Sequence, residues 1–150
     1  MARYVTRIES RLSPAEAFAY MADFTNARFW DPSVSLAELR GDRPIGLGAV
    51  FHLVSRFAGR DVPLLYTIVT FEPPQRVVLE SRKAGFTSRD TITIEPAGAG
   101  SVLHYDALLE LLVEVGAPAA ERLCVVEPDL LDVLHGQARG GGHRPRQLGE

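Results

Sequence analysis

The sequence predicts one α+β domain built on a curved antiparallel sheet. Three features lead to this: a strand pattern near the N-terminus, a capped helical segment directly after it, and a long run of strands and turns from Ser33 to about Glu110. A length of 150 residues suits a single domain, with roughly 70% of the unfolded chain's surface buried at this size. We expect a folded unit over 1–135 and a disordered Gly- and Arg-rich tail over 136–150.

The first strand and the first helix follow each other closely. Polar and apolar residues alternate from Tyr4 to Glu9, which predicts a half-buried strand. Ser13, Pro14 and Glu16 then supply an N-cap oxygen, a proline at the first helical position and a carboxylate that can reach back to the cap. We therefore expect a helix from here, and a second short helix that ends before Pro32.

Six strands are expected between Ser33 and about Glu110, because Gly- and Pro-rich turn signals interrupt this segment at short intervals. Such short connections join antiparallel neighbours, whereas parallel strands need crossovers of about a dozen residues or more. A doubly wound nucleotide-binding fold is therefore excluded. The period-two alternation places apolar side chains on one face of every strand, with a few polar groups, such as Ser88 and Asp90, set among them.

The segment after Leu111 should be helical, since one face of the sheet would otherwise stay uncovered. Pro118 and Pro128 interrupt it, and an internal proline costs a helix about 3 kcal/mol. An irregular helix made of short pieces is therefore expected. Because composition also changes abruptly, a shift in the reading frame near residues 108–118 is a further hypothesis.

Composition argues against several classes of partner. The net charge is -3 and the basic residues are scattered, so no stripe is available to bind nucleic acid. Cys124 is the only cysteine and no Cys/His group has zinc spacing, which predicts a reducing compartment, no metal and no cofactor. Neither a signal peptide nor a run of about 18 apolar residues occurs, so we expect a cytoplasmic protein without a membrane span.

Several segments, in their order along the chain, carry a family resemblance: Leu12–Phe18, Trp30–Pro32, Gly46–Gly48, Phe71–Pro74 and Asp90–Pro96. Together they resemble the SRPBCC superfamily, the helix-grip fold of START lipid-transfer and birch-pollen-allergen-like proteins, and specifically its bacterial polyketide cyclase/dehydrase-like members. The resemblance implies a seven-stranded antiparallel sheet curled around a long C-terminal helix, with an apolar cavity between them. The two prolines and the Gly/Arg-rich tail depart from that pattern.

The resemblance also implies which side chains face a ligand. Asp90 is the strongest candidate for a functional residue, because alternation places its carboxylate on the apolar face, where an unpaired charge is energetically costly. The alternatives without a function are that Asp90 lies at a solvent-exposed strand end or pairs with Arg56 or Arg82, and that the aromatic residues only pack. The full set of candidate ligand-binding residues is Trp30, Phe51, Leu53, Phe57, Tyr66, Ile68, Leu79, Phe86, Ser88, Asp90 and Tyr105.

Three functions remain open from the sequence. The leading one is binding of a hydrophobic small molecule, a lipid or an aromatic polyketide-like compound, in the implied cavity. The second is a polyketide cyclase or dehydratase, with Asp90 as general base and Tyr66 or Tyr105 polarising a carbonyl. The third is a protein interaction module, in which an open groove accepts a partner chain or a second copy as a homodimer.

Overall fold

The structure is a computed structural model that describes residues 2–57, 59–83 and 85–111. The predicted C-terminal helix and the predicted tail lie outside these residues. In the described part of the chain, no helix is long and apolar enough to cross a membrane. The elements are β1 (Ala2–Ser10), α1 (Pro14–Ala22), the 3-10 turn η1 (Phe24–Asn26), α2 (Ala27–Trp30), β2 (Val34–Arg40), β3 (Val50–Phe57), β4 (Arg60–Glu72), β5 (Arg76–Lys83), β6 (Phe86–Ala97) and β7 (Gly100–Leu111).

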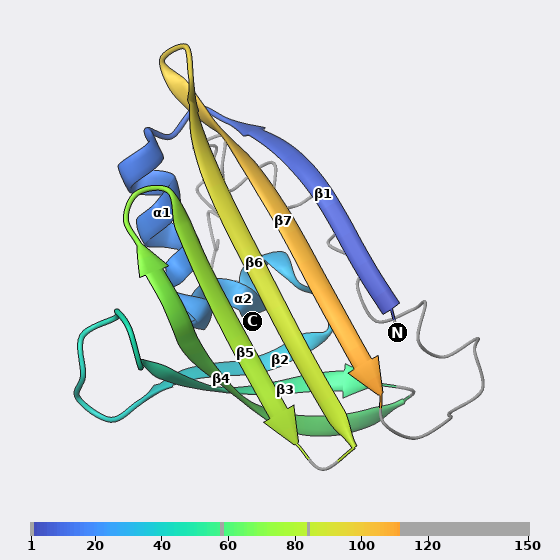
Figure 1. The fold of residues 1–150 in the computed structure, drawn as a ribbon. Helices are drawn as coiled ribbons and strands as arrows, with labels where there is room; N and C mark the ends of the chain where they lie inside the picture. The colour runs from blue at the N-terminus through green and yellow to red at the C-terminus, as the bar shows by residue number, and fades with distance from the viewer. Residues whose placement is uncertain (1, 58, 84, 112–150) are drawn as a thin grey trace, which may run out of the picture.

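All seven strands form one antiparallel sheet in the order β1-β7-β6-β5-β4-β3-β2. The predicted six-strand meander is confirmed, and β1 completes the sheet by pairing with the last strand rather than with its neighbour in sequence. Figure 1 shows β5, β6, β7 and β1 running alongside one another, while β2 and β3 cross beneath them at a steep angle. The sheet is therefore strongly curled, as the predicted fold class requires.

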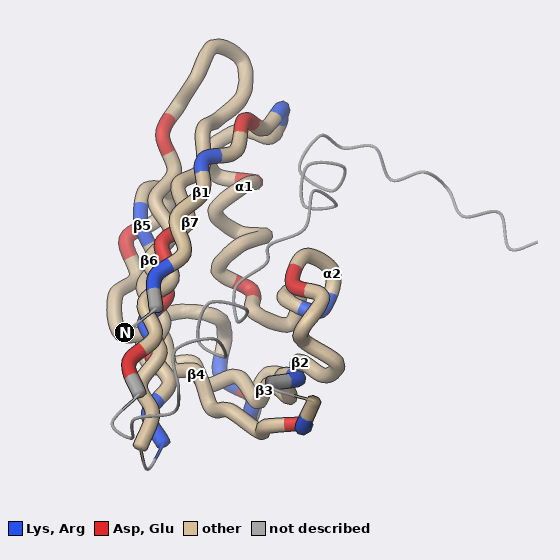
Figure 2. The backbone as a smooth tube through the Cα atoms, turned by 90° about the vertical axis from the view of Figure 1, so that its right-hand side faces the viewer, with Lys and Arg blue, Asp and Glu red and all other residues tan. Residues whose placement is uncertain are grey.

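The bend occurs within β4, which pairs with β3 along its first part and with β5 along its second. The pairing of β4 with β5 shifts register between Ile68 and Thr70, and such an irregularity increases local twist and bends a strand. Both helices lie on one side of the sheet, within the curve, as the side view in Figure 2 shows. The sheet consequently has a concave face partly covered by helices and a convex face that carries most of its charged residues.

The predicted capping box at the start of α1 is present. The Ser13 hydroxyl accepts a hydrogen bond from the Glu16 backbone N–H at 3.2 Å, and the Glu16 carboxylate accepts one from the Ser13 N–H at 3.0 Å. These bonds satisfy two of the N–H groups that every helix start leaves without an intrahelical partner. After α1, Asp23 caps η1 by accepting from the Thr25 N–H at 3.0 Å. The chain thus turns from α1 into α2 under the concave face.

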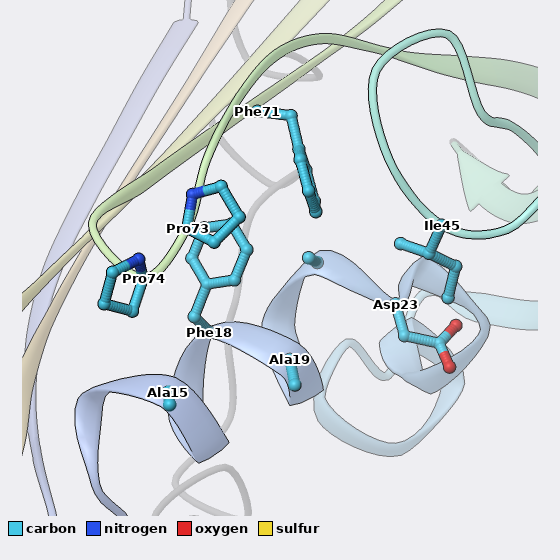
Figure 3. A pocket seen from close by; sticks show the side chains of 9 residues that line it. Ala15, Phe18, Ala19, Asp23, Ile45, Phe71, Pro73 and Pro74 are labelled. Carbon is cyan, nitrogen blue, oxygen red and sulfur yellow. The ribbon is translucent and has the colours of Figure 1, made fainter.

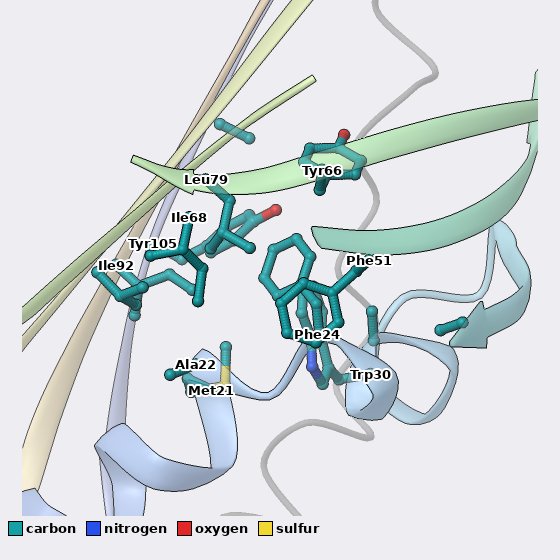
Figure 4. Packing of buried hydrophobic residues seen from close by; sticks show 14 of the residues in the cluster. Met21, Ala22, Phe24, Trp30, Phe51, Tyr66, Ile68, Leu79, Ile92 and Tyr105 are labelled. Atoms are coloured by element: carbon teal, nitrogen blue, oxygen red, sulfur yellow. The ribbon is translucent and has the colours of Figure 1, made fainter. Parts of the chain in front are cut away.

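Apolar side chains from both helices and from the strands meet between the helices and the sheet (Figure 4). Phe24 is at the centre, with ring centroids 5.8 Å from Trp30, 6.1 Å from Phe51 and 5.4 Å from Tyr66. Such tilted and edge-to-face contacts add about 0.5–1.5 kcal/mol each beyond simple burial. Phe24 therefore fixes α2 against β3 and β4.

The corner between β1 and α1 depends on a glycine. Gly100, the first residue of β7, lies so close to the backbone carbonyl of Ser10 that an added Cβ would collide with it. Nearby, the Ser101 hydroxyl donates to the carbonyl oxygen of Leu12 at 2.9 Å. The first residues of β7 therefore fix the segment that joins β1 to α1, and this positions α1 against the concave face of the sheet.

Candidate functional site

A chain of hydrogen bonds crosses the concave face of the sheet and ends on Asp90. The Tyr105 hydroxyl donates to Oδ2 of Asp90 at 3.0 Å, and the Ser88 hydroxyl donates to Oδ1 at 3.2 Å. The Tyr66 hydroxyl donates in turn to Ser88 Oγ at 3.1 Å. All four residues are buried, and Asp90 is only 5% exposed. A carboxyl group is thus held by two hydroxyl donors inside an apolar surround.

The strand register brings these four residues together. Tyr66 of β4 pairs with Ser81 of β5, which pairs with Ser88 of β6, so the three lie in one row across the sheet. Asp90 follows two residues later on the same face, and Tyr105 of β7 lies diagonally across from it, within reach of a long side chain. Residues 22 and 15 positions apart in sequence, Tyr66 with Ser88 and Asp90 with Tyr105, therefore become neighbours.

Burial dominates the acidity of this carboxyl group. Desolvation raises the pKa of Asp90 to about 7, against the lowering effect of the hydrogen bonds from Tyr105 and Ser88, and the negative charge of Asp31 raises it further. Burial also raises the pKa of Asp31, which is partly offset by hydrogen bonds from Ser33. A side chain with a pKa near neutrality exists in both proton states at working pH, so Asp90 can accept or donate a proton.

Aromatic rings and two unpaired donors surround the network. The ring centroids of Trp30, from α2, and Tyr105 lie 5.5 Å apart in an edge-to-face contact. On β1, which pairs with β7, the ring centroid of Tyr4 lies 6.3 Å from that of Tyr105. Trp30 Nε1 and Ser81 Oγ are buried without a hydrogen-bond partner in the part of the chain that the structure describes. Buried donors without partners are uncommon in folded proteins and call for an explanation.

The structure places most of the predicted ligand-binding residues on this one face. Phe51, Leu53, Ile68 and Leu79 are buried in the same cluster as Trp30 and the two tyrosines, while Phe86 is only partly buried at its margin. Phe57 ends β3, and its side chain is outside the described atoms.

The two structural alternatives for Asp90, a solvated strand end and an ion pair with Arg56 or Arg82, are wrong. Asp90 lies in the middle of β6, with 5% exposure, rather than at a solvated strand end. Arg56 pairs with Asp61 at 3.4 Å and Arg82 with Glu80 at 3.2 Å, so neither predicted arginine partners it.

Two residues of the site were missed from the sequence. Ser81 alternates with Val77 and Leu79 along β5, and this alternation was the signal that could have placed it on the inner face. Asp31 was noted only as part of a family motif, and nothing in its local pattern shows that its charge would act on Asp90. Among the described residues, no group of three His, Cys, Asp or Glu side chains could hold a metal ion.

A separate apolar pocket of about 500 Å³ lies between α1, Ile45 and the turn from β4 to β5 (Figure 3). Phe18 and Phe71 both line it, with ring centroids 5.3 Å apart. It contains none of the predicted ligand-binding residues. Its lining consists of Ala15, Phe18, Ala19, Ala22, Asp23, Ile45, Phe71, Pro73 and Pro74.

Solved structures from several bacteria share this fold. A START superfamily protein from Mycobacterium smegmatis aligns with a TM-score of 0.65 at 14% identity, covering 81% of this chain and 85% of that one. A protein from Deinococcus radiodurans aligns with a TM-score of 0.66 at 12% identity, covering 89% and 95%. A Rhizobium loti protein aligns with a TM-score of 0.55 at 26% identity, covering 77% and 83%.

Sequence comparison leads to the family. No curated protein matches the sequence. The family model described as "Polyketide cyclase / dehydrase and lipid transport" matches residues 1–129, a range that includes the segment 108–118 where composition changes. With the seven-stranded curled sheet, this match shows that the chain belongs to the polyketide cyclase/dehydrase and lipid transport family of the SRPBCC superfamily.

Proposed function

We propose that the protein binds a hydrophobic small molecule, a lipid or an aromatic polyketide-like compound, against the concave face of the sheet. The observation that carries this proposal is the Asp90 network, a set of hydrogen-bonding groups concentrated at one place on an otherwise apolar surface. Ligand sites in proteins combine a mostly apolar lining with a few placed polar groups in this way. The family description, which names lipid transport, supports the same proposal.

Packing alone would be served better by apolar residues at these positions. A buried carboxyl group loses its hydration, and even a neutral hydrogen-bonded group gains little for stability in return. Ser81 adds a buried hydroxyl with no partner among the described residues, which stability alone does not require. A ligand oxygen that accepts from Ser81 would satisfy it.

The direct test is native mass spectrometry of the protein purified from its own host, followed by extraction and identification of any retained compound. The expected result is a stoichiometric apolar molecule that carries at least one oxygen. An empty protein with no thermal shift across lipid and aromatic polyketide panels would contradict the proposal. Light scattering that then showed a dimer at high concentration would favour the interaction module instead.

A second candidate function is favoured by the pKa of Asp90, which burial raises to about 7. In this scheme the Asp90 carboxylate removes a proton from a carbon next to a carbonyl group, and Tyr66 or Tyr105 turns its hydroxyl from its present acceptor to the carbonyl oxygen. For cyclisation, the resulting enolate attacks a second carbonyl carbon of the polyketide, and the new alkoxide takes the proton back from Asp90. For dehydration, the enolate expels a β-hydroxyl group, which takes that proton and leaves as water. Asp90→Asn should then abolish product formation, measured by liquid chromatography and mass spectrometry, with ligand affinity nearly unchanged. Equal turnover by wild type and variant would refute Asp90 as the general base, and no turnover by either protein would refute catalysis while leaving binding intact.

The cellular setting stays a prediction from the sequence. A cytoplasmic location and the lack of a nucleic-acid partner follow from composition and charge. Cell fractionation with an antibody against the native protein would test the location.

A further inference from the structure

The concave site has acidic groups and no buried positive charge among the described residues. Asp90 is the only buried acidic residue of the described ranges, and the partly buried Asp31 lies near enough for its negative charge to act on Asp90. Every arginine and lysine of the described ranges is exposed. The two described histidines, His52 and His104, are sequence neighbours of the inward-facing Phe51 and Tyr105, so they lie on the other face of the sheet. Among the described residues, the concave face therefore offers a carboxylate-bearing ligand no buried positive charge that could neutralise it.

A hydrogen-bond donor is nevertheless available next to Asp90. Ser81 is 1% exposed, and its hydroxyl has no partner in the described part of the chain. Its register partners on either side, Tyr66 and Ser88, belong to the network that ends on Asp90. An acceptor oxygen placed in this row would accept a hydrogen bond from the Ser81 hydroxyl, close to the Asp90 carboxyl group.

We propose that this site selects uncharged ligands that carry a carbonyl or hydroxyl oxygen and rejects ligands that carry a carboxylate. The inference rests on the proposed binding function and specifies its ligand class. Free fatty acids and other organic acids are thereby excluded, whereas ketones, phenols, alcohols and esters are accepted.

The physical reason is the repulsion between like charges in a poorly solvated place. A ligand carboxylate seated beside Asp90 requires either two negative charges at close range or a proton bound to one of them. Neighbouring like charges shift such protonation equilibria by at least about one pKa unit, equivalent to about tenfold in affinity. A neutral carbonyl avoids this cost and accepts from the serine.

Three probes of nearly equal shape separate charge from hydrogen bonding: 2-acetylnaphthalene, 2-naphthoate and 2-ethylnaphthalene. Binding is measured at pH 8 by isothermal titration calorimetry or by displacement of the neutral dye Nile red. We expect the ketone to bind at least about tenfold more tightly than the carboxylate, the penalty for one unit of like-charge repulsion. Asp90→Asn should tighten naphthoate selectively, and Ser81→Ala should weaken the ketone without affecting ethylnaphthalene.

A matched control is Asp106→Asn. Asp106 is a carboxylate on β7 that faces away from the site and pairs with Arg3, so its removal should leave the preference unchanged. Retained ketone binding by Asp90→Asn shows that this variant is folded. Equal affinities of wild type for ketone and carboxylate, or a preference that survives Asp90→Asn, would overturn the selectivity while leaving the binding function standing. Failure of all three probes and of Nile red to bind would contradict both.

Discussion

Replacing Asp90 by asparagine should remove a large pH dependence from the stability of this protein. In the folded state burial raises the pKa of Asp90 to about 7, while the ordinary value is 3.8. Folding therefore takes up a proton between these two values, and the free energy of unfolding falls as pH rises from about 4 to about 7 and then levels off. Asparagine keeps the shape and an acceptor oxygen for Tyr105 or Ser88 but carries no titrating proton.

The size of the effect follows from the pKa difference. Each unit corresponds to about 1.4 kcal/mol, so Asp90 alone should cost wild type about 2 to 3 kcal/mol of stability between pH 5 and pH 8.5. The difference in unfolding free energy, Asp90→Asn minus wild type, should rise by the same amount over that range. Because the negative charges of Asp31 and Asp90 act on each other, the difference also includes the effect of Asp90 on the titration of Asp31.

The assay is urea denaturation followed by circular dichroism at half-unit pH steps, with the unfolding free energy taken from linear extrapolation. Asp106→Asn is the control, because the hydrogen bond from Arg3 lowers the pKa of Asp106 and places its titration below this range. Wild-type and Asp90→Asn curves that stay parallel from pH 5 to pH 8.5 would refute the buried, raised carboxyl group on which the site is built.

The remaining predictions concern single contacts. Tyr105→Phe removes a hydrogen bond that lowers the pKa of Asp90, so the midpoint of the stability change should move to higher pH in the same urea series; a midpoint that stays or falls would contradict the contact. Gly100→Ala should destabilise the fold by more than about 2 kcal/mol through the backbone collision at the end of β1, as overpacking typically does. Gly46→Ala, whose Cβ would have ordinary contacts, should be tolerated, and equal losses would argue against the collision. Ser13→Ala should lower the urea midpoint by an amount equivalent to about 1 kcal/mol, the usual value of an N-cap; no change would mean that the capping box contributes nothing.

The fold could be predicted because each local signal agreed with the final arrangement. The capping residues Ser13 and Glu16 predicted where the first helix begins, and glycine and proline predicted the turns between strands. Alternation along β6 placed Asp90 on the inner face before any partner was known, because the side-chain period of a strand leaves no choice once the apolar face is identified.

The partners of Asp90 could not be predicted in the same way. Which residues lie opposite each other depends on register, and the irregular pairing of β4 with β5 between Ile68 and Thr70 breaks any simple count from the turn. Ser81 therefore could not be aligned with Tyr66 from the sequence. The influence of Asp31 depends on how α2 packs against the sheet, which strand periodicity does not encode.

The pairing of the first strand with the last has a consequence for how the chain folds during synthesis. Ala2 of β1 aligns with Leu109 of β7, so the sheet cannot be completed until about 100 residues beyond β1 have been translated. At about 5–20 residues per second, β1 waits several seconds or longer after it leaves the ribosome. Until then the hairpins from β2 to β6 form without it, and its inward side chains, such as Tyr4 and Ile8, are available to chaperones that bind nascent chains.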